Sequence, residues 1–234
     1  MRSLATLQAL LIPLAAAGCA GDVPVNAPAQ PPLAALVEAV REGRLDAITV
    51  TDRPLVPQDW ERLRGLTGLR ELVLDQGVAD DTVADILGSL TGLQRLVLRE
   101  SPLGDAGFQA LARCTSLRDL NVPRAGCTVA GLEAIAGLES LRSLRLGGPG
   151  LRGPEVARTL ATLPALQSLH LIDVPIGDEG LAALGGATGL GNLYLDGAGV
   201  SDRAWEDYFK KQPHVHVHVD QAHHDRDPGG DHPP

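Results

Sequence analysis

The chain is organised by one stretch, Leu166 to Gly189, which reads LQSLHLIDVPIGDEGLAALGGATG. Its arrangement of leucines recurs along the sequence at intervals of 24 residues, with one interval of 25. The copies begin at Leu45, Leu69, Leu93, Leu117, Leu141, Leu166 and Leu190. A period of this length predicts a solenoid, because one short unit cannot bury its apolar side chains until neighbouring units stack against it.

Each copy contains the spacing of a strand followed by that of a helix. In the third copy, Leu96 and Leu98 close a Leu-x-x-Leu-x-Leu motif, and their spacing of two places both on one face of a short strand. Phe108 and Leu111 follow at a helical spacing of three. We expect Asp105, just before them, to cap the N-terminus of that helix. Each copy is therefore expected to form a strand, a turn, a short helix and a second turn.

This pattern resembles that of leucine-rich repeat proteins over residues 45–219. The segments GDAGF (104–108) and GDEGL (177–181) are most similar to the helical, ribonuclease-inhibitor-like class of that family. The resemblance implies an α/β solenoid with a curved parallel sheet on the concave side and short helices on the convex side. The chain departs from the family in its shorter repeat and at the position of the ladder-forming Asn. That position holds Gly77, Ser101, Ala125, Pro149, Val174 and Ala198.

The composition agrees with one aliphatic domain and restricts its partners. The chain has 234 residues, of which 44% are hydrophobic but only 3% aromatic, as a core built of leucine requires. Its formal net charge of −9 argues against binding to nucleic acid or to an anionic membrane surface. The acidity also serves solubility.

The N-terminus has the layout of an export signal. Arg2 precedes an apolar run from Leu4 to Ala17, which is too short to span a bilayer. The run ends in Ala-Ala-Gly-Cys, which resembles the lipobox of bacterial lipoproteins. We therefore expect residues 1–18 to be a lipoprotein signal peptide and Cys19 to be acylated. A plain secretory signal and an uncleaved anchor are the alternatives. Ala20 after the cysteine implies, by resemblance, an outer-membrane location at the bacterial cell envelope.

The remaining chain divides by composition into four parts. Residues 19–32 are rich in Pro and Ala and predict a tether. Residues 33–44 predict an N-terminal capping helix, Leu33 to Glu42, and residues 45–220 predict seven repeats and a final strand, His214 to Val219. Residues 221–234 form a His- and Asp-rich tail with almost no apolar side chains, which predicts disorder.

The outward-facing strand positions predict a concave binding surface for an unidentified protein partner, with the chain itself a monomer. Its expected centre column runs through Val73, Val97, Asn121, Arg145, His170, Tyr194 and His218. Arg and Tyr often supply binding hot spots, so we expect the binding energy to concentrate at the C-terminal end of this column. The candidate residues are Arg145, His170, Tyr194, His218, Arg95, Arg99, Asp119, Asn192 and Asp196. The alternative is a merely solvated face, since exposed strand positions are polar in any case.

A second hypothesis concerns metal ions. Six of the seven histidines lie between His214 and His232, and clustered imidazoles suit Zn²⁺, Ni²⁺ or Cu²⁺. The candidate ligands are His216, His218, His223 and His224. No fixed ligand spacing accompanies them, so this hypothesis rests on composition.

No catalytic set is predicted, and no cofactor motif is present. The glycines recur with the repeat rather than forming a phosphate loop. Cys114 and Cys127 occupy two different apolar columns, so we expect both to be small buried core residues that do not pair.

Overall fold

The computed structural model describes residues 31–76 and 78–223. These residues belong to one compact unit. The predicted signal peptide and Cys19 lie outside the described residues, as do most of the tether and the tail from residue 224 onward.

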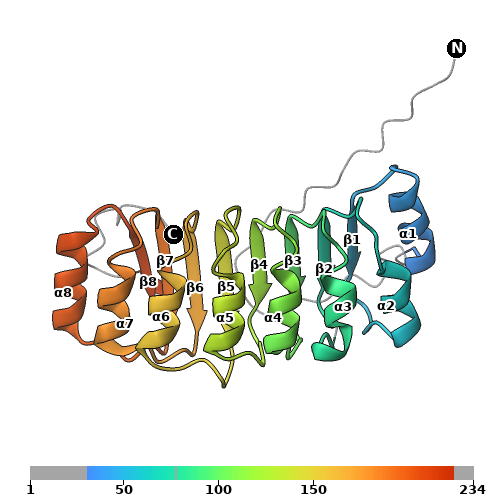
Figure 1. Cartoon of the computed structure of the whole chain (residues 1–234). Coiled ribbons are helices and arrows are strands. Elements are labelled where there is room, and N and C mark those ends of the chain that lie inside the picture. The colour runs from blue at the N-terminus through green and yellow to red at the C-terminus, as the bar shows by residue number, and fades with distance from the viewer. Residues whose placement is uncertain (1–30, 77, 224–234) are drawn as a thin grey trace, which may run out of the picture. The chain divides into compact units, whose positions relative to one another are not determined.

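Within the described residues, one sheet of nine strands runs in sequence order (Figure 1). The first eight strands are parallel, and each pairs with the strand one repeat further along the chain. The strands are β1 (Ala47–Val50), β2 (Glu71–Leu74), β3 (Arg95–Leu98), β4 (Asp119–Val122), β5 (Ser143–Gly147), β6 (Ser168–Ile172), β7 (Asn192–Asp196), β8 (His216–Val219) and β9 (Ala222–His223). The parallel order confirms the predicted α/β leucine-rich repeat solenoid.

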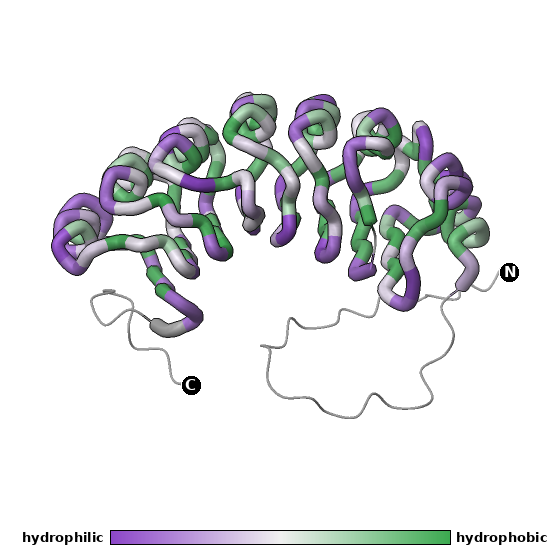
Figure 2. The backbone as a smooth tube through the Cα atoms, turned by 90° about the horizontal axis from the view of Figure 1, so that it is seen from below, coloured by the Kyte–Doolittle hydropathy of each residue, from purple (hydrophilic) through white to green (hydrophobic). Residues whose placement is uncertain are grey.

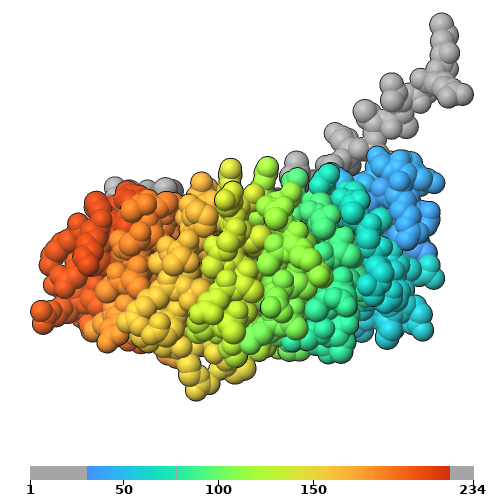
Figure 3. Space-filling view, in the orientation of Figure 1, coloured from blue at the N-terminus to red at the C-terminus, as the bar shows by residue number. Residues whose placement is uncertain are grey.

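Short helices alternate with the strands and line the outer side of the curve, while the strands line the inner side (Figure 2). The helices are α1 (Leu33–Arg41), α2 (Pro57–Leu63), α3 (Ala84–Leu87), α4 (Asp105–Leu111), α5 (Val129–Ile135), α6 (Pro154–Leu160), α7 (Gly177–Leu184) and α8 (Asp202–Lys211). A 3₁₀ turn, Asp81–Val83, precedes α3. In the space-filling view each repeat forms one band across the surface (Figure 3).

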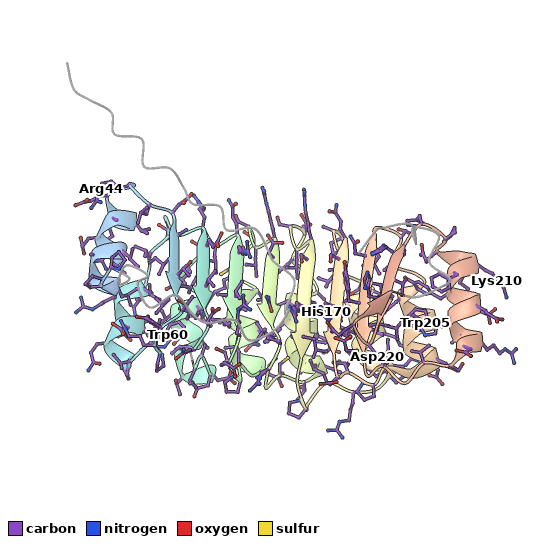
Figure 4. The ribbon with its side chains drawn as sticks, turned by 180° about the vertical axis from the view of Figure 1, so that it is seen from behind. Arg44, Trp60, His170, Trp205, Lys210 and Asp220 are labelled. Carbon is purple, nitrogen blue, oxygen red and sulfur yellow. The ribbon has the colours of Figure 1, made fainter. Side chains whose placement is uncertain are left out.

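The core is a continuous aliphatic stack between the sheet and the helices. The inward strand leucines, such as Leu96, Leu120 and Leu169, are at most 1% exposed. Trp60 in α2 and Trp205 in α8 occupy equivalent buried positions near the two ends of the solenoid (Figure 4). The larger rings therefore fill the end units, where fewer neighbours are available to complete the core.

Helix α1 packs against the first repeat. Leu33, Val37 and Val40 are at most 4% exposed and belong to the same hydrophobic cluster as the repeats. Pro32 precedes the helix with extended dihedral angles, which suits entry into a first helical turn. The first unit of the solenoid is thus covered by a helix rather than by another repeat.

The predicted capping role of the helical aspartates is wrong in one respect: they cap the next repeat, not their own. Gly104 is the N-cap of α4, and no side chain caps that helix from this position. Instead, Asp105 Oδ1 accepts hydrogen bonds from the backbone N–H groups of Thr128 at 2.7 Å and Gly131 at 3.0 Å. Asp81 serves α4 in the same way. The carboxylates reach forward because stacked helices begin side by side, one repeat apart.

The C-terminal tail also departs from the prediction of disorder at its start. Ala222–His223 forms strand β9, antiparallel to β8. Asp220 and Gln221 make the connecting turn with φ values of 50° and 66°, the positive angles that tight two-residue hairpins require. Gly197 N–H donates to Asp220 Oδ1 at 2.8 Å. The hairpin forms because the outer edge of β8 offers unpaired backbone groups.

Strand β8 itself is shorter than predicted and begins at His216, not His214. Pro213 and His214 lie in a turn, in which Val215 N–H donates to the Gln212 carbonyl at 3.3 Å. Proline has no N–H to give to a sheet, so the strand begins after this turn.

Candidate functional site

The concave face is built by the outward positions of the parallel strands. The register pairs Asn121 with Arg145, Arg145 with His170, His170 with Tyr194, and Tyr194 with His218. Because the strands stay in register from repeat to repeat, residues one repeat apart become neighbours across the sheet, about 4.8 Å from strand to strand. The structure therefore brings the predicted centre column together.

The rings of this column form one cluster. The Tyr194 ring lies 5.4 Å from the His170 ring and 5.0 Å from the His218 ring, measured between centroids. His216, from the neighbouring column, approaches Tyr194 edge-on at 6.5 Å. Such offset and edge-on contacts are favourable and hold the rings in defined positions. We call His170, Tyr194, His216 and His218 the ring cluster.

A carboxylate holds one end of the ring cluster in place. His170 Nε2 lies 2.9 Å from Asp196 Oδ2, and both side chains are largely buried. Asp196 also accepts a hydrogen bond from the backbone N–H of Gln221 at 3.1 Å and one from the Gln221 side-chain amide. Figure 4, seen from the strand side, labels His170 in β6 and Asp220 in the turn that follows β8. Gln221 thus supports the concave face, although its composition-based prediction was the disordered tail. The signal in the sequence for this role was its position directly after Asp220, at the end of the last predicted strand.

The other end of the ring cluster contains two imidazoles in direct contact. His216 Nε2 and His218 Nε2 are 2.8 Å apart, so one N–H donates to the other nitrogen. Two donors cannot share this contact, and therefore both imidazoles cannot be protonated at Nε2 in this geometry.

Of the candidate metal ligands, the structure brings together only the side chains of His216 and His218. Within residues 31–76 and 78–223, no group of three or more His, Cys, Asp or Glu side chains is placed to hold a metal ion. His223 pairs with His218 through the backbone, and His224 lies outside the described residues. Metal binding therefore remains a prediction.

The remaining candidates lie at the first and last concave columns. Arg95, Asp119 and Asn192 lie in the first column, where Arg95 and Asp119 are exposed and Asn192 is half-buried. Arg99 lies at the far end of β3 and forms an ion pair with Asp75 at 2.7 Å. Arg99 is thus already engaged within the chain, whereas Arg145 is exposed and forms no ion pair with the described residues.

Val97 is an exception within the centre column, whose positions are expected to be exposed. It faces the concave side but is only 3% exposed, and it lies outside the main core cluster. Its register neighbours are Val73 and Asn121, and the curvature of the sheet draws side chains on this face together. Among the described residues, no group donates a hydrogen bond to the buried Oδ1 of Asn121.

The cysteines are core residues, as predicted. Cys114 and Cys127 are free and 0% exposed. Burial raises the pKa of the Cys114 thiol to about 11 and that of Cys127 to about 12. Both stay protonated near neutral pH, and a thiol is a poor nucleophile compared with a thiolate.

Two hollows in the surface of the described residues lie away from the concave face. One is lined by Pro154, Ile176 and Ser201, and the other lies between α7 and α8 beside Tyr208. Neither is lined by a histidine or a cysteine. Asp178, which lines both hollows, accepts a hydrogen bond from the backbone N–H of Ser201 at 2.7 Å.

Comparisons with known proteins support the fold. No family model and no curated protein sequence matches the chain. Among solved structures, it is similar to an internalin (inlF) from Listeria monocytogenes with a TM-score of 0.60 and 19% identity, over 81% of this chain and 51% of that one. It is also similar to internalin C2 from the same organism, with a TM-score of 0.57 and 20% identity, over 75% of this chain and 71% of that one. The chain thus spans about half the length of the first of these proteins.

In the part of the chain that the structure describes, no helix is both long and apolar enough to cross a membrane.

Proposed function

We propose that the chain is a protein-interaction module that binds its partner on the C-terminal half of the concave face. The observation that carries the proposal is the continuous line of Arg145, His170, Tyr194 and His218 across β5 to β8. It supplies a free guanidinium, a phenol and imidazoles on a rigid sheet. Arg and Tyr are enriched among residues that dominate binding energy. No enzymatic activity is proposed.

The sequence supports a location for this module. We propose that Cys19 is acylated and anchors the chain at the bacterial cell envelope, in the outer membrane, through the tether of residues 19–32. The lipobox-like Ala-Ala-Gly-Cys segment is the support. Each buried methylene of an acyl chain contributes about 0.8 kcal/mol, so two or three chains give stable anchoring. The GDAGF and GDEGL segments support the ribonuclease-inhibitor-like repeat class.

A pull-down tests the interaction. The soluble unit from Pro31 onward serves as bait, because it is compact by itself. We expect it to capture a protein that the Tyr194→Ala bait captures weakly or not at all. Equal capture by both baits would contradict a site at the ring cluster.

A truncation separates this function from metal handling. Removing the chain from His223 onward deletes most of the histidine-rich tail but leaves the line from Arg145 to His218 in place. We expect capture of the partner to persist in the truncated bait. The metal hypothesis would be favoured instead if the truncated bait captured nothing and the full chain captured the partner only in the presence of Zn²⁺.

A further inference from the structure

Three arginines lie at the N-terminal ends of three consecutive strands, β3 to β5, and a fourth lies in the middle of β5. Arg95 is the first residue of β3, Arg118 and Arg142 directly precede β4 and β5, and Arg145 is the third residue of β5. All four are exposed. Arg142 N–H donates to the Arg118 carbonyl at 2.8 Å, so these two residues are adjacent rungs of the sheet. We call the four residues the basic rim.

The arginines of the basic rim form no ion pair with any described residue, unlike the arginines at the other end of the same strands. There, Arg99 pairs with Asp75 at 2.7 Å and Arg124 pairs with Glu100 at 2.8 Å. Asp119 in β4 and Glu71 in β2 are the register neighbours of Arg95, yet neither forms an ion pair with it among the described residues.

This arrangement does not stabilise the chain by itself. Arg118 and Arg142 are like charges on adjacent rungs and repel one another. The chain carries 29 acidic residues against 20 Lys and Arg, so acidic side chains are in excess. The guanidinium groups of the basic rim are thus open to a group outside the chain. A guanidinium presents a planar set of donors that fits a carboxylate through two parallel hydrogen bonds.

We propose that the basic rim binds an acidic segment, rich in Asp and Glu, of the protein partner. The proposal rests on the proposed function that the concave face binds a protein, and it adds the chemistry of that protein. Arg145 belongs both to the centre column and to the basic rim, so one partner reaches the ring cluster and the basic rim together. Gln94 and Gln167 occupy the equivalent rungs on either side of Arg118 and Arg142 and offer further hydrogen-bond donors.

The size of the basic rim favours an acidic peptide over nucleic acid. The rim spans two strand spacings, about 10 Å, and the surrounding chain is acidic. A phosphate backbone is held by many Lys and Arg contacts along its length, and a net charge of −9 opposes its approach.

The test uses the soluble unit from Pro31 onward and a fluorescein-labelled peptide of alternating glutamate and serine. Fluorescence anisotropy is measured at low salt and at about 0.15 M salt, where exposed charge interactions are screened. The Arg118→Glu/Arg142→Glu variant removes the centre of the basic rim without touching the ring cluster. The matched control is Arg62→Glu/Arg203→Glu, which makes the same charge change at exposed arginines of α2 and α8 that form no ion pair with the described residues.

We expect the peptide to bind the wild type more tightly at low salt, and the rim variant to bind at least about tenfold more weakly. The control variant should remain within about twofold of the wild type. Equal weakening in both variants would show a general effect of net charge and would overturn the proposal. So would no binding to the wild type, or tighter binding of a single-stranded oligonucleotide than of the peptide.

Failure here is distinguishable from failure of the proposed function. If the peptide does not bind but Tyr194→Ala still abolishes capture of the partner, the concave face binds a protein whose contacts are not acidic. The proposal that the basic rim binds an acidic segment is then wrong, and the proposed function stands.

Discussion

The Asp105 carboxylate accepts a hydrogen bond from the backbone N–H of Thr128 at 2.7 Å, across the boundary between two repeats. Its second oxygen accepts one from the Thr128 hydroxyl at 2.8 Å. Asp178 bonds the backbone N–H and hydroxyl of Ser201 with closely similar distances. These carboxylates satisfy free N–H groups at the first turn of the next helix, and they connect consecutive repeats.

We expect Asp105→Ala to lower the free energy of unfolding by about 1–2 kcal/mol, because three donors lose their acceptor. Asp85→Ala is the matched control, since Asp85 is exposed and its ion pair with Arg113 is long, at 3.8 Å. The control should change stability by less than about 0.5 kcal/mol. Urea unfolding of both variants measures the difference, and equal losses would contradict a role between repeats.

Stability should fall in acid through the same groups. The N–H of Thr128 holds the pKa of Asp105 below its usual range, and the N–H of Ser201 does the same for Asp178. A lowered folded pKa means that the stabilisation is present above the ordinary pKa of about 3.9 and is lost as the pH falls through the folded value. Melting temperatures measured from neutral pH down to about pH 2 should therefore drop less steeply in Asp105→Asn/Asp178→Asn than in the wild type. An identical drop would show that other carboxylates control the acid transition.

The buried strand positions should tolerate no charge. Leu120 is 1% exposed in β4, and Leu120→Asp should cost about 3–5 kcal/mol because the carboxylate has no partner there. Arg145→Asp, on the exposed face of β5, should cost less than about 1 kcal/mol. Val97→Asp does not serve as the mild control, since Val97 is itself buried. Similar melting temperatures for the Leu120 and Arg145 variants would contradict the register.

The anchor prediction concerns Cys19. We expect Cys19→Ala to abolish incorporation of a labelled fatty acid and to leave the protein unprocessed or soluble, because no thiol remains to accept the acyl chain. Ser3→Ala, within the same segment, should label normally. Membrane fractionation and labelling measure both variants, and a labelled Cys19→Ala protein would show that the anchor assignment is wrong.

The period predicted the fold and the centre column because it alone fixes which residues become neighbours. A constant interval places His170, Tyr194 and His218 on adjacent strands whatever their chemistry. The period does not show how closely the side chains on one face of the sheet pack together, so the burial of Val97 was missed. Nor does it show how far one repeat is offset from the next, which decides that Asp105 reaches Thr128. Strand β9 depended on a turn at Asp220 and Gln221, for which the sequence lacks the usual glycine.

The most direct test of the central claim is the affinity of the captured partner for Arg145→Ala/Tyr194→Ala, measured by titration calorimetry beside the melting temperature. We predict binding weaker by at least about tenfold, or about 1.4 kcal/mol, with a melting temperature within about 3 °C of the wild type. Arg62→Ala/Arg203→Ala, on the helical side, should bind as the wild type does. Unchanged affinity in the concave variant, with affinity lost in the helical one, would contradict a binding site on the concave face.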